Sequence, residues 1–216
     1  MKRFTLPLVI LGVVAGVLWR FPPFHIVRLA EVEAAKREEA FDAPGFARKF
    51  WEERLTPARE TAADAQKVVA AIQTDPQAAR VEFGRTVGVS RGYFYFLRGE
   101  GQVVSVADGR IGLSLEKGPD ADVVLLVGKL FGNAVRDATG LVDASDFPNS
   151  QHFNAISQEL NRLVETEVVP SVVKLAKIGQ QLRFVGCAEV KSEKDDLRPL
   201  KLVPLSVTLT DPQATP

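Results

Sequence analysis

Residues 93–115 read YFYFLRGEGQVVSVADGRIGLSL, and this stretch decides the fold. From Tyr93 to Val106 the sequence has the two-residue period of a β-strand. Gly99 and Gly101 interrupt that strand, and paired glycines within a strand indicate a bulge or a sharp coil. Asp108-Gly109 then predicts a hairpin turn. The sequence therefore predicts one long, bent strand that returns through a tight turn.

Further strands are expected along the chain after this hairpin. Ile111, Leu113 and Leu115 alternate with polar or small residues, which predicts a strand with one face in water. Residues 123–127 are apolar throughout, which predicts a central strand buried on both faces. The remaining expected elements are a helix over about 150–167 and two strands over about 182–190 and 203–209.

Three strands, a helix and two strands follow one another in the order of an OB-type barrel. We therefore predict an α+β protein with a five-stranded, OB-like β-barrel over residues 85–210 and a helix between its third and fourth strands. An N-terminal membrane anchor and a helical annex precede the barrel. An open antiparallel sheet covered by the same helices is the alternative, since the sequence alone leaves the strand order open.

The residues before the barrel divide into three segments. Residues 1–24 begin with Met1-Lys2-Arg3 and continue without a charge from Phe4 to Trp19, which predicts a signal-anchor transmembrane helix. A charged stalk is expected over 25–41. The last segment, 42–84, predicts a helical annex, which begins at Asp42-Ala-Pro44 with a capping residue and a first-turn proline.

The charges beside the apolar segment also predict the topology. Lys2, Arg3 and the amino terminus outweigh Arg20, so the N-terminus stays in the cytoplasm. The protein is then a single-pass protein of the inner membrane with its main domain in the periplasm. A cleaved signal peptide is the alternative, although Val14-Ala15-Gly16 is a poor cleavage site. At the other end, residues 211–216 predict a flexible tail.

Composition excludes several classes of function. The 27 basic and 27 acidic residues balance, which argues against a nucleic-acid binder. The run from Tyr93 to Phe96 still leaves an OB-type nucleic-acid binder as a disfavoured alternative, since exposed aromatic rings could stack on bases. One cysteine, Cys187, and two distant histidines match no familiar zinc site, and no cofactor is expected.

Several short motifs along the chain are distinctive when taken together. They are Phe41-Asp42 leading to Phe50-Trp51 and Pro57, the run from Phe96 to Val106, Gly132 with Ala134 and Arg136-Asp137-Ala138, Asp146-Phe147 with Asn149, and Leu160-Asn161. In these residues the chain resembles an uncharacterised bacterial family of predicted periplasmic lipoproteins, over about 24–209. The resemblance implies a periplasmic location and genes beside those of sugar ABC transporters. Family members carry a lipid-accepting cysteine before an Ile-Val pair, whereas Phe24-His25 precedes Ile26-Val27 here.

The long connection between the third strand and the main helix holds the candidate binding residues. Loops on a rigid scaffold are where binding residues gather. Arg136 could clamp an anionic or hydroxylated ligand, with Asp137 or Asn149 completing a polar pocket. The candidate set for a ligand or partner is Arg136, Asp137, Asp146, Phe147, Asn149 and Asn161. In the structural alternative, Arg136 and Asp137 form an ion pair and Asp146 and Asn149 are cap and turn residues.

A hydrolase is a further alternative. Gly88-Val89-Ser90-Arg91-Gly92 matches a nucleophile elbow, with His152 and Asp137 or Asp143 as partners for Ser90. A nucleophile elbow follows a strand and precedes a helix, and this order is reversed here. The carboxylates of Asp137 and Asp146 are the other catalytic candidates. No constellation is complete, so we expect a membrane-anchored, non-enzymatic module that binds ABC transporter components or a small solute.

Overall fold

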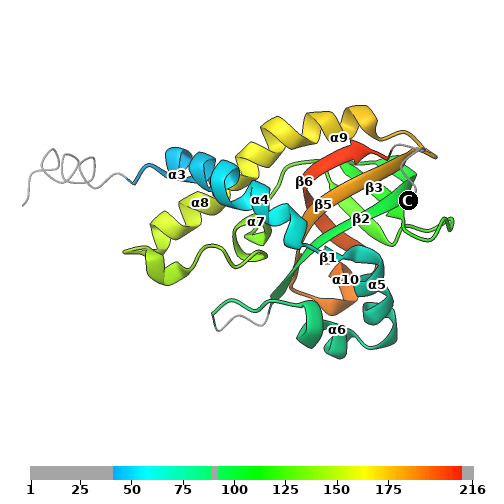
Figure 1. The fold of residues 1–216 in the computed structure, drawn as a ribbon, viewed down its shortest axis with the longest axis horizontal. Coiled ribbons are helices and arrows are strands. Elements are labelled where there is room, and N and C mark those ends of the chain that lie inside the picture. The colour runs from blue at the N-terminus through cyan, green and yellow to red at the C-terminus, as the bar shows by residue number, and fades with distance from the viewer. Residues whose placement is uncertain (1–40, 89–91, 211–216) are drawn as a thin grey trace, which may run out of the picture. The chain divides into compact units, whose positions relative to one another are not determined.

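The structure is a computed structural model that describes residues 41–88 and 92–210 (Figure 1). The described residues from Asp42 to Thr210 belong to one compact unit. The helical elements are α3 (Ala43–Phe50), η1 (Trp51–Leu55), α4 (Thr56–Ala58), η2 (Arg59–Thr61), α5 (Ala65–Thr74), α6 (Pro76–Phe83), α7 (Ala134–Asp137), η3 (Ala144–Asp146), α8 (Ser150–Leu163), η4 (Val164–Val168), α9 (Val169–Leu175) and α10 (Glu193–Asp196). The strands are β1 (Ala63–Asp64), β2 (Tyr93–Ala107), β3 (Arg110–Ser114), β4 (Val123–Leu126), β5 (Gln181–Val190) and β6 (Leu200–Leu209).

The strands form one six-stranded sheet that closes on itself. β2 pairs antiparallel with β3, β3 with β4, β6 with β5, and β5 with β2, while β4 and β6 run parallel. These five pairings make a ring, and β1 adds a short parallel strand to β2. The predicted α+β class and the order of three strands, a helix and two strands are confirmed. The five strands expected over 85–210 are β2 to β6, and the sheet gains β1 from the segment predicted as a helical annex, because a two-residue strand is too short to show a period.

The glycine interruption lies where β2 changes neighbours. β1 pairs with Leu97 and Arg98, whereas β3 pairs with β2 only from Gln102 onward. β5 accompanies β2 on its other edge through the whole interval. A Cβ atom on Gly99 would lie 2.9 Å from the Cβ of Ala65 in α5. The missing side chain at Gly99 therefore allows α5 to approach the bend.

Two predictions about strand burial need correction. β3 was expected to have one face in water, but Ile111 to Ser114 are all buried. Closure of the sheet places one face of β3 inside, and the chain that follows β3 covers part of the other. β4 was expected to be buried on both faces, yet only Val123 and Leu125 are fully buried.

The helices differ from prediction at their ends. The main helix was expected to end near residue 167, but η4 and α9 continue it to Leu175. Pro170 is tolerated there because it occupies the first turn of α9, where its missing N–H costs little. In Figure 1 the α8–α9 run lies on one side of the sheet and α5, α6 and α10 lie on the other. α3 packs along α8.

The predicted anchor (1–24), nearly all of the stalk (25–41) and the tail (211–216) lie outside the described residues. Between Phe41 and Thr210, the helices that the structure describes include none long and apolar enough to cross a membrane.

Candidate functional site

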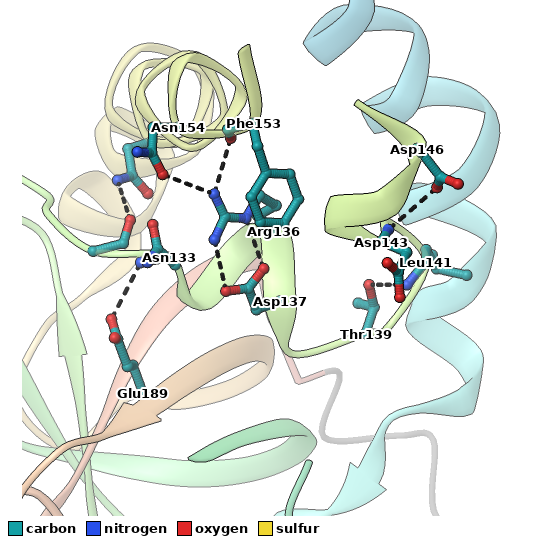
Figure 2. Close-up of polar contacts among 12 residues, drawn as sticks. Asn133, Arg136, Asp137, Thr139, Leu141, Asp143, Asp146, Phe153, Asn154 and Glu189 are labelled. Carbon is teal, nitrogen blue, oxygen red and sulfur yellow. Dashed lines mark hydrogen bonds and ion pairs between the residues drawn. The ribbon is translucent and has the colours of Figure 1, made fainter. Parts of the chain in front are cut away.

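Arg136 and Asp137 lie together inside the protein, on the short helix α7. Only 4% of Arg136 and 3% of Asp137 is exposed. Arg136 Nε donates to Asp137 Oδ1 at 2.6 Å and Nη2 donates to Oδ2 at 2.9 Å, which makes a two-bond ion pair. Nη1 donates to the carbonyl of Phe153 at 2.9 Å, and the guanidinium lies over the Phe153 ring (Figure 2). The pair therefore joins α7 to α8 from within the core.

The side chains of Asp146 and Asn149 accept hydrogen bonds from backbone N–H groups. Asp143 and Asp146 form a capping box around η3, with the Asp143 N–H donating to Asp146 Oδ2. Figure 2 shows these two carboxylates apart from the Arg136 cluster. Asn149 caps α8, since its Oδ1 accepts from the N–H of His152 at 2.9 Å. Such bonds are those of cap and turn residues, and a ligand role for Asp146 and Asn149 stays a prediction.

Replacing Asn149 with alanine is expected to lower the free energy of unfolding by about 1 kcal/mol, because the start of α8 loses its cap. Urea unfolding measures the change. Asn149→Asp is the matched control, since aspartate keeps an oxygen acceptor and adds a negative charge at a helix start. Equal stability of Asn149→Ala and the native protein would show that the cap is not needed.

Phe147 packs between helices. Its ring meets Phe46 of α3 edge-on at 5.3 Å and lies 5.6 Å from the ring of Phe153 in α8, both between ring centroids. Part of Phe147 remains accessible. Its contacts explain how the connection before α8 is fastened to α3.

Asn161 belongs to a different arrangement, around the loop of residues 129–133, which we call the Phe131 loop. Three side chains hold its backbone. Asn161 Nδ2 donates to the carbonyl of Gly132 at 3.0 Å. The carboxylate of Glu165 accepts from the N–H of Leu130 at 2.7 Å, and that of Glu189 accepts from the N–H of Asn133 at 3.1 Å. Figure 2 shows Glu189 of β5 reaching Asn133 from the sheet side.

Phe131 lies at the middle of this fastened loop and is 78% exposed. Gly132 beside it has φ +90°, a conformation that glycine adopts without strain. A single exposed apolar side chain is common on protein surfaces. Phe131 differs in that three side chains hold its loop in place. Phe131 was not among the residues predicted from the sequence, although an aromatic residue directly before a glycine in a loop was the available signal.

The charge of the Glu165 carboxylate helps to hold the Phe131 loop. Burial disfavours its ionised form, but hydrogen bonds from Lys129 Nζ and from the Leu130 N–H outweigh burial. The pKa of the Glu165 carboxyl therefore lies below its usual value, and the group is ionised at neutral pH.

An open cleft of about 660 Å³ adjoins the Phe131 loop. Polar residues of α8, among them Asn154, Gln158, Asn161 and Arg162, line its other side. The helical spacing of Asn154, Gln158 and Asn161 alone favours a solvated face of α8. Asn154 and Gln158 are exposed, whereas Asn161 is buried, and all three line the cleft together with Phe131.

Comparison with known proteins places the chain. The family described as "Predicted periplasmic lipoprotein (DUF2291)" matches residues 8–208. The chain belongs to this family. This membership confirms the predicted family and supports an extracytoplasmic location; the association with ABC transporter genes remains a prediction.

A solved structure supports the fold of this DUF2291 member. An OB-fold protein from Thermotoga maritima is similar, with 28% identity and a TM-score of 0.70, over 79% of this chain and 99% of the other. The predicted OB-like character is thereby confirmed. No functionally curated protein matches the chain.

The family description names a lipoprotein, in which an N-terminal cysteine accepts the lipid. The one cysteine of this member is far from the N-terminal segment. Cys187 lies in β5 and is wholly buried. Burial also raises the pKa of its thiol, so the reactive thiolate is disfavoured.

The hydrolase and nucleic-acid hypotheses find little support in the described residues. Ser90 lies outside them, while α6 precedes it and β2 follows it, the reverse of a nucleophile elbow. Tyr93, Phe94 and Tyr95 are buried, and only Phe96 of that run is half-buried. The start of β2 therefore presents no row of exposed rings on which bases could stack.

Proposed function

We propose that this protein is an extracytoplasmic, non-enzymatic module that docks a component of a solute-uptake transporter through the Phe131 loop. The exposed Phe131 ring, on a loop whose backbone is held by three side chains, is the observation that carries the proposal. The predicted anchor over residues 1–24 would hold the module at the inner membrane, in place of a lipid.

The Phe131 loop and the cleft beside it have the composition of a protein-binding site. Protein interfaces typically combine a central aromatic residue with a polar rim. Here Lys129, Asn154 and Arg162 surround the cleft beside Phe131. When a partner covers the ring, its apolar surface leaves water. Burial of an aromatic side chain removes about 150–250 Å² of surface from water.

Preorganisation of the loop favours tight binding. A binding loop that is mobile loses conformational freedom when it binds, and this loss weakens affinity. The Phe131 loop is held through Leu130, Gly132 and Asn133, so its backbone is already fixed. A fixed loop that presents an exposed ring therefore suits a binding surface.

The proposal predicts site-specific capture in intact cells. A photo-crosslinking phenylalanine analogue at position 131 is expected to join the protein to a membrane transporter component, identified by mass spectrometry. The matched control places the analogue at Ile178, which is 68% exposed and lies outside the cleft. Phe131→Ala is expected to reduce co-purification of the same component at least tenfold.

Two results would contradict the proposal. One is equal capture from positions 131 and 178, which would indicate random collision. The other is undiminished co-purification with Phe131→Ala while urea unfolding shows unchanged stability.

A further inference from the structure

A second concave region lies where β2 passes from β1 to β3. The groove has a volume of about 680 Å³ and is open to solvent. Gly99 and Glu100 of β2 form part of its lining, together with Asp64, Arg59 and Gln181 from neighbouring segments. We call it the Arg59 groove.

The sheet edge is incomplete within this groove. β1 pairs with β2 as far as Arg98, and β3 pairs with it from Gln102. Between these points, β5 is the one described strand with which Gly99 to Gly101 pair. An extended peptide can add to such an unpaired edge through main-chain hydrogen bonds. Backbone groups of alternate residues in a strand point to opposite edges. Val103 bonds on the β5 side and Phe94 on the other side, so within the gap the N–H and C=O of Glu100 face the open edge.

Arg59 is the unsatisfied cation of the groove. Within residues 41–88 and 92–210 no carboxylate forms an ion pair with it, and its buried Nε has no hydrogen-bond partner. Its guanidinium lies 5.5 Å from the centre of the Trp51 ring. Burial lowers the pKa of Arg59, so the guanidinium is partly desolvated. A carboxylate matches the planar fork of this group.

The other groove cations already have partners. Arg98 Nη1 lies 3.3 Å from a Glu60 oxygen, and Arg183 Nη2 lies 2.6 Å from a Glu100 oxygen. Both pairs are exposed at the groove wall. An added anion is therefore expected to bind at Arg59 rather than at these arginines.

The same groove offers acceptors for a donor group. The buried Oε1 of Gln181 has no hydrogen-bond partner in the described part of the chain. The Asp64 carboxylate, which accepts the N–H of Lys67 at 3.0 Å, supplies a negative charge. Three carboxylates and three guanidiniums line the groove, so its formal charge is zero. A ligand with balanced charges suits this lining better than a phosphate dianion.

We infer that the Arg59 groove binds a zwitterionic α-amino acid or short peptide, with the ligand carboxylate on Arg59 and its ammonium group toward Gln181 and Asp64. The inference is independent of the proposed transporter partner, which would dock at the Phe131 loop.

Calorimetric titration of the full chain in detergent tests the inference. The probes are L-alanine and L-alanyl-L-alanyl-L-alanine. We expect at least one of them to bind, and the tripeptide to bind more tightly if the unpaired edge of β2 takes part. The N-acetylated and the C-terminally amidated tripeptides each lack one charge and are expected to bind at least tenfold more weakly than the free tripeptide.

Variants locate the site. Arg59→Gln and Gln181→Met are each expected to weaken binding of the better probe at least tenfold. Arg110→Gln is the matched control, because Arg110 is exposed on β3 and does not line the groove. Urea unfolding checks that each variant folds, and Gln181→Met keeps the test decisive if Arg59→Gln is unstable.

Three results would overturn the inference. The first is that neither L-alanine nor the tripeptide binds. The second is full binding of both blocked tripeptides, which would remove the zwitterion requirement. The third is binding that folded Arg59→Gln and Gln181→Met variants retain, which would place the ligand elsewhere. Capture through position 131 would be unaffected by any of these results.

Discussion

Replacing Asp137 with alanine is expected to lower the free energy of unfolding by about 3–5 kcal/mol, as breaking a buried ion pair typically does. The change leaves the Arg136 guanidinium in the core without its carboxylate. Two hydrogen bonds, at 2.6 and 2.9 Å, are lost at once. The bond from Nη1 to the Phe153 carbonyl remains, but it does not balance the charge. Urea unfolding followed by circular dichroism measures the loss.

Two further variants distinguish the effect of leaving a buried charge unpaired from the effect of removing a carboxylate. Glu53 forms an exposed pair with Lys49 at 4.0 Å, so Glu53→Ala is expected to change stability by less than about 1 kcal/mol. The double variant Arg136→Met, Asp137→Leu removes both charges and keeps apolar volume. It is expected to be more stable than Asp137→Ala, because no unpaired charge remains buried.

A small loss in Asp137→Ala, equal to that of Glu53→Ala, would contradict the structural role of the pair. The ligand role predicted from the sequence would then gain support, since residues kept for binding need not stabilise the fold. A large loss would show that α7 and α8 depend on this pair for their packing, whether or not a ligand also reaches it.

The elements that the sequence predicts well are those defined by local signals. The hairpin from β2 to β3 follows from Asp108-Gly109, and both residues have positive φ as such a turn requires. The start of α3 follows from Asp42, whose side chain accepts from the N–H of Gly45. Each signal acts within a few residues, so one sequence is enough to read it.

The features that the sequence misses depend on distant contacts. β1 is extended because it pairs with β2, more than thirty residues later. The wet face expected for β3 is covered because the sheet closes, which no local pattern shows. Phe131 stands before a glycine in the sequence, but the fixed backbone of its loop depends on Glu165 and Glu189, far along the chain. Likewise, the Arg59 groove joins residues from four separate segments.

The glycine bend of β2 can be tested by adding one carbon atom. Gly99→Ala is expected to lower the free energy of unfolding by about 1–3 kcal/mol, because the new Cβ meets the Ala65 Cβ at 2.9 Å and the Phe184 ring at 3.1 Å. Gly118→Ala is the matched control, since a Cβ there would meet only Ser114 Oγ, at 3.7 Å. Urea unfolding compares the two variants.

A double-mutant cycle assigns the clash to α5. Ala65→Gly removes the nearest atom but places a glycine in a helix, which costs about 1 kcal/mol by itself. If the contact with Ala65 is the cause, the double variant Gly99→Ala, Ala65→Gly loses less stability than the two single losses added together. If the two losses of stability simply add, the added Cβ of Gly99→Ala is accommodated by other contacts than the one with Ala65. Gly99 also lines the Arg59 groove, so a coupled pair would show that α5 packs directly against one wall of that groove.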